Sequence, residues 1–179
     1  ALPIYSKGFI ISVNVLIPAA QILKDFASSR NIVSASSCGL CGRTNFEDTI
    51  TNNVIVDEAR IDSQLIPNLF RQMRDAQKDF SQSGGTHAAA AFDEAGNMIG
   101  SMEDIGRHNA VDKLIGHLLM KVELHHAKCI IVSGRLSFEI VNKVLSANIP
   151  VLASVSAPSS MAIEMAERGG LDRKSTRLN

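Results

Sequence analysis

Hydrophobic and polar positions follow two patterns along the chain, one typical of strands and one typical of helices. Strand-like apolar runs occupy residues 9–17, 86–92, 98–102, 129–132 and 151–155. Apolar residues recur every three or four positions over 65–80, 109–122, 137–147 and 158–167, which predicts amphipathic helices. The runs 86–92 and 98–102 flank Asp93-Glu-Ala-Gly-Asn97, a hairpin turn, and from residue 129 onward strand and helix alternate. The sequence thus predicts an α/β fold in three layers, a mixed sheet with flanking helices.

Small, polar and basic residues gather where the predicted strands end. Ser-Gly-Arg follows the strand 129–132, and a serine-rich run follows the strand 151–155. The strand 98–102 leads through the charged segment 103–113 into a helix, and Gly-Gly-Thr-His precedes the first hairpin strand. In an open α/β sheet, ligands bind outside the carboxyl ends of the strands. These segments therefore form a candidate binding site.

An anionic, phosphorylated ligand fits the chemistry of these strand ends. Three segments place free backbone N–H groups at a helix start, where an anion is favoured. Arg107 and Arg135 each have a side chain suited to grip a phosphate with two hydrogen bonds. Any single segment is explained equally well by a helix cap and a surface arginine. The inference of a pocket depends on the joint position of the three segments. We assign to it Gly85, His87, Asp104, Arg107, His108, Asn109, Asp112, Ser133, Gly134, Arg135 and Ser156.

Two interpretations of the charged segment 103–113 remain open. His108 suits a general acid or base, because the unperturbed pKa of histidine lies near neutrality, and it suits equally a hydrogen-bonded wall residue. A solvated helix start would explain Asp104 as a cap and Asp112 and Lys113 as exposed charges.

The thiol pair Cys38-Gly-Leu-Cys41 is the sharpest chemical feature of the chain. Two cysteines at this spacing can form a disulfide, hold a metal or pass a sulfur atom, and Arg43 favours the thiolate. A structural zinc site needs four ligands, but the third cysteine, Cys129, lies in an apolar strand expected in the core. A thioredoxin-like pair opens a helix, which the residues after Cys41 do not favour. Two unreactive loop cysteines remain the simplest alternative.

Composition narrows the class of protein. The 179 residues are 45% hydrophobic, as in a globular domain, and 18 basic residues balance 18 acidic ones, so no overall field favours nucleic acid. No apolar run approaches the ~20 residues of a membrane span. No signal peptide is visible, and three cysteines argue against a secreted disulfide framework. We expect a cytoplasmic protein that binds neither membrane nor nucleic acid.

Several segments together resemble the FdhD family of formate dehydrogenase accessory sulfurtransferases. The segment 103–113 is long and specific, and the matching stretches follow the family's order. They are Ser36-Ser-Cys-Gly-Leu-Cys-Gly42, Gly84-Gly-Thr-His-Ala-Ala89, Glu103-Asp-Ile-Gly-Arg-His-Asn-Ala-Val-Asp-Lys113, Ser133-Gly-Arg135 and Leu152-Ala-Ser-Val-Ser-Ala-Pro158. The resemblance covers about residues 36 to 171.

The resemblance implies an activity, a client and partners. A cysteine desulfurase would load sulfur as a persulfide on Cys38, with Cys41 as its partner. The protein would bind the bis-molybdopterin guanine dinucleotide form of the molybdenum or tungsten cofactor and give it a sulfido ligand for formate dehydrogenase. The family implies a homodimer and a fold like that of cytidine deaminases without their zinc, with no permanently bound metal. A molybdenum-cofactor-binding chaperone with non-catalytic thiols is the alternative.

The resemblance also sets the expected domain organisation. Residues 1–171 correspond to one FdhD-like sulfurtransferase domain, and the family's N-terminal segment is expected to be absent. Beyond Leu171 the family continues with a hydrophobic strand and a Gly/Arg-rich segment implicated in cofactor binding. This chain instead has the polar residues 172–179, which show no strand pattern and are expected to form a divergent, disordered tail.

Overall fold

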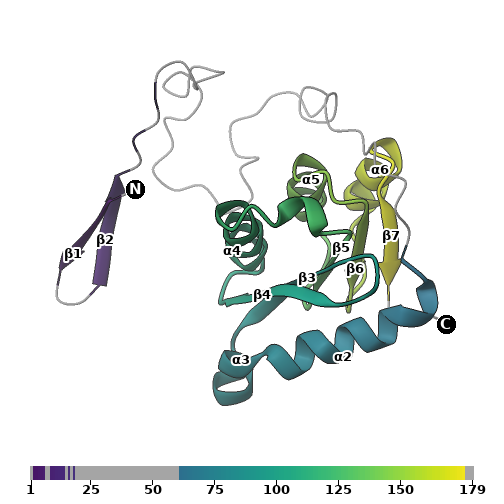
Figure 1. Ribbon diagram of the computed structural model, residues 1–179, viewed down its shortest axis with the longest axis horizontal. Coiled ribbons are helices and arrows are strands. Elements are labelled where there is room, and N and C mark those ends of the chain that lie inside the picture. Colours follow the sequence, from purple (N-terminus) through teal and green to yellow (C-terminus); the bar gives the residue numbers. More distant parts are fainter. Residues whose placement is uncertain (1, 7–8, 15, 17, 19–60, 176–179) are drawn as a thin grey trace. The chain divides into compact units, whose positions relative to one another are not determined.

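Two compact units make up the chain, Ala1–Ala35 and Ser36–Asn179. The computed structural model describes residues 2–6, 9–14, 16, 18 and 61–175. In the first unit, β1 (Leu2–Ser6) pairs antiparallel with β2 (Phe9–Asn14) (Figure 1). The sequence predicts the start of β2 at residue 9 but not β1. The two strands pair with each other as a hairpin.

A five-stranded mixed sheet forms the centre of the second unit. Its order is β4-β3-β5-β6-β7, and the strands are β3 (His87–Phe92), β4 (Met98–Asp104), β5 (Cys129–Val132), β6 (Val151–Ser154) and β7 (Asp172–Ser175). β3 is antiparallel to both β4 and β5, whereas β5, β6 and β7 run parallel. The predicted parallel section and hairpin are both confirmed.

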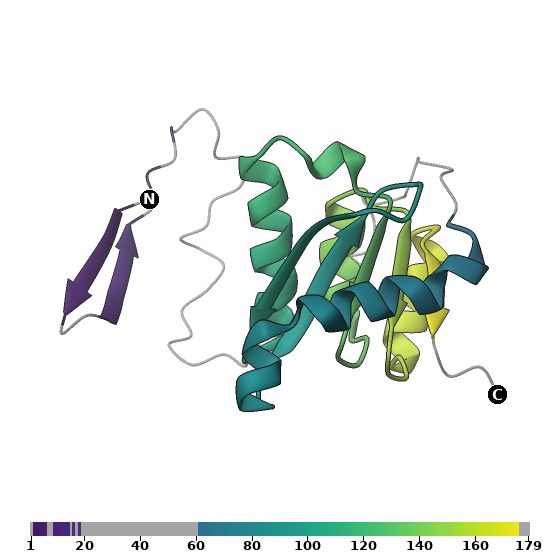
Figure 2. The ribbon, with the colours of Figure 1, turned by 60° about the horizontal axis from the view of Figure 1, so that its bottom comes forward.

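Helices cover both faces of this sheet, which confirms the three predicted layers. α2 (Ile66–Ala76) crosses one face and is followed by the short α3 (Lys78–Ser83) (Figure 2). The opposite face carries α4 (Arg107–Met120), α5 (Phe138–Ser146) and α6 (Ser160–Arg168). Two 3-10 turns, η2 (Ser63–Leu65) and η3 (Leu124–His126), precede α2 and β5.

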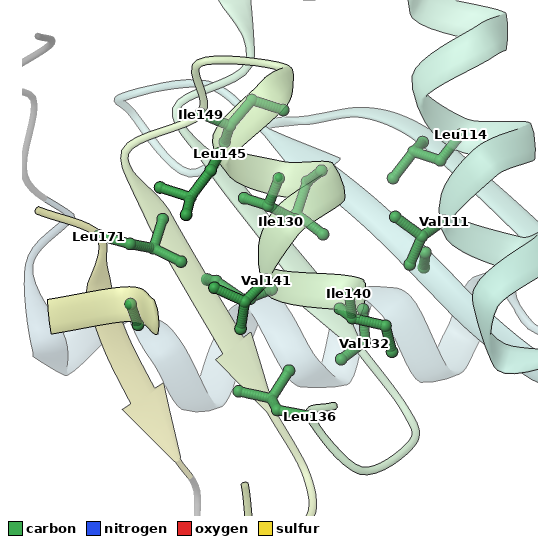
Figure 3. Close-up of a cluster of buried hydrophobic side chains, with 14 of the residues drawn as sticks. Val111, Leu114, Ile130, Val132, Leu136, Ile140, Val141, Leu145, Ile149 and Leu171 are labelled. Carbon is green, nitrogen blue, oxygen red and sulfur yellow. The ribbon is translucent and has the colours of Figure 1, made fainter. Parts of the chain in front are cut away.

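The alternation of side chains along β3 divides the core into two clusters. Ala89 and Ala91 face the helices α4–α6, whereas Ala88, Ala90 and Phe92 face α2. In the larger cluster, α4, α5 and the sheet interlock through branched side chains (Figure 3). Its labelled members are Val111, Leu114, Ile130, Val132, Leu136, Ile140, Val141, Leu145, Ile149 and Leu171. Burial of these apolar surfaces stabilises the fold.

A tight turn closes the β3–β4 hairpin. The Asp93 carboxylate accepts hydrogen bonds from the backbone N–H of Asn97 (2.8 Å) and from its side-chain amide (2.9 Å). These bonds lower the pKa of Asp93, since the side-chain bond from Asn97 outweighs the effect of desolvation. Gly96 adopts a φ of 82°, a backbone conformation that favours glycine.

The predicted helix over 65–80 is broken in the structure. Gln77 leaves the helical region, with φ −78° and ψ 78°, and separates α2 from α3. Leu69 and Met73 are buried as the periodicity predicts, but Phe80, placed on the same face by the sequence, is 45% exposed. The physical reason is tertiary, because Glu103 of β4 binds the first amides of α3.

The expectation of a disordered tail is wrong for its first four residues. Residues 172–175 form β7, which pairs in parallel with β6 in the register Val151↔Asp172. Backbone hydrogen bonds to β6 make this strand, and the buried Leu171 anchors its start, so its polar side chains do not prevent it. Residues 176–179 lie outside the described residues.

Candidate functional site

The predicted binding segments do meet at one edge of the sheet. His87, at the start of β3, lies opposite Asp104, at the end of β4. The Ser133 hydroxyl accepts a hydrogen bond from the Ala88 N–H (2.9 Å), which ties the end of β5 to the start of β3. The Ser154 hydroxyl donates to the carbonyl oxygen of Gly134 (3.2 Å) and so links the end of β6 to the same place.

Two side chains converge over a residue that has none. A Cβ atom at Gly134 would lie 3.3 Å from Nδ1 of His87 and 3.4 Å from both Cβ and Cδ of Arg107. The Nε atom of Arg107 is buried and has no hydrogen-bond partner among the described residues. Buried donors are nearly always paired, so this group is available for an acceptor from a ligand. We call His87, Arg107 and Gly134 the Arg107 cradle.

A cavity of about 780 Å³ opens between α2, α3 and this edge of the sheet. Phe70 and Met73 of α2 and Phe80 of α3 provide apolar lining, while Arg74 adds a positive charge. His87 lines the cavity as well as the cradle. The α2 cavity therefore joins an apolar, partly aromatic space to a site that suits an anion.

Asp104 and Asn109 hold the turn into α4 together. The Asp104 carboxylate accepts hydrogen bonds from the Gly106 N–H (2.9 Å) and the Asn109 side-chain amide (3.2 Å). It also forms an ion pair with Lys113, and that hydrogen bond contributes most to lowering the pKa of Asp104. These bonds fix the turn that leads into Arg107, the first residue of α4, so Asp104 and Asn109 help to position the Arg107 cradle.

The other assigned residues are less closely connected with the cradle. Asp112 pairs with Lys143 (2.6 and 2.8 Å), which joins α4 to α5. Arg135 is exposed, Ser156 is half-buried, and Gly85 lines the α2 cavity beside Thr86. Sequence reasoning brought the right strand ends together, but it did not distinguish residues that face a cavity from those that bind a neighbouring helix.

His108 is buried behind the cradle, with only 6% of its surface exposed. Its Nε2 lies 2.9 Å from the Ser137 hydroxyl, at the cap of α5, and 3.7 Å from a carboxylate oxygen of Glu139. Burial lowers the pKa of His108, and the neighbouring positive charge of Arg107 lowers it further. The geometry matches a hydrogen-bonded wall residue that joins α4 to α5.

Of the three cysteines, the structure describes Cys129. Cys38 and Cys41 lie outside the described residues, as does Arg43. Cys129 is fully buried in β5, as the sequence predicts, and burial is the main cause that raises its pKa to about 12. A thiol that stays protonated is a poor nucleophile, so Cys129 is unsuited to carrying sulfur.

Sequence reasoning missed two parts of the site. Phe70 and Arg74 of α2 line the cavity, and Glu103 of β4 binds Thr86 and the start of α3. Neither α2 nor α3 carries a recognisable sequence motif. Glu103 does lie within the charged segment 103–113, at its first position. Among the described residues, no group of three or more His, Cys, Asp or Glu side chains is arranged to hold a metal. The described helices are also too short or too polar to cross a membrane.

Comparisons with known proteins match the chain to one protein family. The model of the FdhD/NarQ family matches residues 8–172. The sulfur carrier protein FdhD of Streptomyces avermitilis is 42% identical over 164 residues, which cover 89% of this chain and 58% of that protein. The sulfur carrier protein FdhD of Thermoplasma acidophilum is 47% identical over 137 residues, 76% of this chain and 49% of that protein. The chain thus spans about half the length of these relatives.

A solved structure supports the fold. The crystal structure of a putative formate dehydrogenase accessory protein from Desulfotalea psychrophila superposes with a TM-score of 0.65 at 24% sequence identity. The match covers 71% of this chain and 54% of that one. At this identity the likeness speaks for the fold alone.

Proposed function

Since the chain belongs to the FdhD/NarQ family, we propose that it is a sulfurtransferase of formate dehydrogenase maturation. It carries sulfur from a cysteine desulfurase as a persulfide on Cys38 and delivers it to a molybdenum cofactor in the bis-guanine-dinucleotide form. The relatives named as sulfur carriers support the first half of this proposal. The observation that carries the second half is the unpartnered, buried Nε of Arg107 in the cradle beside the α2 cavity.

The client molecule matches the chemistry of the described site. Its pyrophosphate is an anion, and the Arg107 cradle offers a guanidinium group over a glycine that leaves room for close approach. Its guanine base is flat and aromatic, and the α2 cavity offers Phe70 and Phe80 for stacking. His87 lines both places, so a nucleotide bound across them would contact it with the phosphate and the base on either side.

Sulfur transfer through the thiol pair balances in two steps. The Cys38 thiolate attacks the terminal sulfur of the desulfurase persulfide, which forms the Cys38 persulfide and releases the desulfurase thiolate. The Cys41 thiolate then attacks the inner sulfur, which forms a Cys38–Cys41 disulfide and releases the outer sulfur as sulfide for the metal. A dithiol reductant then reduces the Cys38–Cys41 disulfide by thiol–disulfide exchange and is itself oxidised to a disulfide. Cys41 would alternatively assist loading, in which case no disulfide accumulates.

Mass spectrometry after incubation with a cysteine desulfurase and cysteine tests this function. We expect a gain of one sulfur atom that maps to Cys38 and is absent from Cys38→Ala. Cys41→Ala should load sulfur but accumulate the persulfide, because the releasing thiol is missing. Sulfur found elsewhere, or loading that survives in Cys38→Ala, would show that the persulfide route is wrong.

The alternative, a cofactor-binding chaperone with non-catalytic thiols, is separated by the same variant. The described site consists wholly of binding groups, which is the observation that favours it. In that case Cys38→Ala would still activate formate dehydrogenase in cells that lack the wild-type protein. Our proposal expects activation to be lost while guanine nucleotide binding is kept.

The remaining expectations from the family belong to the same proposal. They are a homodimer, a cytoplasmic location, a fold related to that of cytidine deaminases, and no permanently bound zinc. Sedimentation of the purified protein tests the dimer, and metal analysis tests the zinc. About one zinc per chain would instead indicate a zinc-binding or redox role for the thiol pair.

A further inference from the structure

One carboxylate at the end of β4 binds the start of a neighbouring helix and the loop that follows that helix. Oε1 of Glu103 accepts a hydrogen bond from the Asp79 N–H (2.9 Å), and Oε2 accepts one from the Phe80 N–H (2.8 Å). The same Oε2 accepts a hydrogen bond from the Thr86 hydroxyl (2.7 Å), just beyond the helix. Glu103 thus caps the start of α3 from a distant strand and also holds the loop that follows it.

α3 itself has little else to fix its position. None of its residues is buried, so it has no apolar anchor in either core cluster. The Lys113 ammonium group donates to the backbone carbonyl of Glu103 (3.1 Å) and so restrains the strand end from the other side. Burial raises the pKa of the Glu103 carboxyl, but the bonds from Thr86, Asp79 and Phe80 outweigh it, and the pKa is lowered. The ionised form is therefore the one that these donors favour.

We infer that Glu103 is a positioning residue that fixes α3, and with it Phe80 and Thr86, as one wall of the α2 cavity. The opposite wall does not need it, because Leu69 and Met73 anchor α2 in the core. The Arg107 cradle rests on the sheet and on α4. Loss of the Glu103 carboxylate should consequently disturb the part of the site that suits an aromatic ring and spare the part that suits an anion.

This consequence rests on the proposed nucleotide site, and it can be measured with two ligands. Pyrophosphate requires only the cradle, whereas guanosine diphosphate also requires the aromatic wall. In Glu103→Gln the side chain keeps its size, but one carboxylate oxygen becomes an NH2 group. That NH2 group cannot accept a hydrogen bond from the donor that it faces. We expect the affinity for guanosine diphosphate to fall about tenfold, the scale of one base stacked on an aromatic ring. The affinity for pyrophosphate should change less than about twofold.

Three further measurements distinguish positioning from a general loss of structure. In Glu103→Gln the amides of Asp79 and Phe80 should exchange with deuterium about tenfold faster, while those of β3 and β5 keep their protection. Thr86→Ser, which keeps the donor, should behave like the wild type, and Thr86→Val, which lacks it, should lower the affinity for guanosine diphosphate in the same direction as Glu103→Gln. Glu94→Gln, an exposed change in the β3–β4 turn, is the matched control and should alter neither affinity.

Each outcome decides the inference. Equal losses of affinity for both ligands in Glu103→Gln, or unchanged exchange at Asp79 and Phe80, would overturn it. If the wild type binds neither ligand, the proposed nucleotide site is wrong, and the exchange rates alone then decide whether Glu103 fixes α3. A selective loss of guanosine diphosphate together with fast exchange in α3 supports both.

Discussion

The two faces of the central sheet are built for different purposes. Three helices, α4, α5 and α6, close one face with the larger cluster of buried side chains (Figure 3). A single long helix, α2, crosses the other face, where a smaller cluster lies next to a cavity of about 780 Å³. The short α3 beside that cavity contributes no buried residue. The comparison indicates that one face is closed by the larger core, whereas the other leaves room for the proposed ligand.

The largest effect should come from a cavity cut into the closed face. Leu114 of α4 is fully buried there, and Leu114→Ala should lower the free energy of unfolding by about 2 to 5 kcal/mol. Leu119, on the same helix, is 58% exposed, and Leu119→Ala should change it by less than about 0.5 kcal/mol. Denaturant unfolding of both variants measures this. Similar values for the two would mean that α4 does not carry the stability of this face.

A change in the cradle should weaken binding and leave stability almost intact. Arg107→Ala removes the guanidinium group, and we expect the affinity for pyrophosphate and for guanosine diphosphate to fall at least about tenfold, as for a lost charged hydrogen bond. Arg168→Ala is the control, since Arg168 is exposed and pairs with Glu164 one turn away (2.6 Å). Calorimetric titration compares them. The cradle would lose its proposed role if both arginines mattered equally.

Acid should release α3 before it affects the closed face. The pKa of Glu103 lies below its ordinary value of 4.5, so its bonds are fully present above that pH and are lost as the pH falls through the lowered pKa. Other charged or titratable groups near Glu103 are Lys78 and Asp79 of α3, Asp104 and His87 at the sheet edge, and Lys113 of α4.

The amide resonance of Phe80 reports this titration in nuclear magnetic resonance spectra. In the wild type it should shift with the ionisation of Glu103, and in Glu103→Gln that shift should vanish. A shift that persists in the variant would mean that another group causes it, and the assignment to Glu103 would fail.

The smallest effect should follow from changing the buried thiol. Cys129 has a pKa of about 12, so Cys129→Ala should leave the loading of sulfur unchanged. In the native protein Cys129 should also resist alkylation until denaturant exposes it, because β5 is covered on both faces. Mass mapping of alkylated peptides before and after unfolding measures this. A loss of sulfur loading in Cys129→Ala would instead indicate that Cys129 carries sulfur.

Local patterns predicted the layered fold because its elements follow their own periodicities. The strand over 129–132 has the predicted bounds, and the helix predicted over 109–122 buries Val111, Leu114 and Leu118 as expected. The meeting of the strand ends also followed from sequence, since topology fixes which ends share an edge. The residues involved, such as His87 and Gly134, do come together there.

What could not be predicted depends on partners distant in the sequence. The helical pattern continues unbroken through Gln77, and only the bonds from Glu103 to α3 explain where the second helix begins. β7 forms by pairing with β6 although its residues are polar. The ion pair of Asp112 with Lys143 of α5 is likewise invisible in the local pattern. Tertiary contacts, which periodicity does not encode, decided each of these cases.

The tight turn that joins β3 to β4 has a consequence for the order of folding. Its two strands are separated by a few residues, whereas β5, β6 and β7 must each wait for a helix to be completed between them. Short loops close in microseconds or less, and long crossovers are slower. We therefore expect the β3–β4 hairpin to form early, and with it the pairing of His87 with Asp104. The hairpin that carries the proposed binding edge would then serve as the template on which the rest of the sheet assembles.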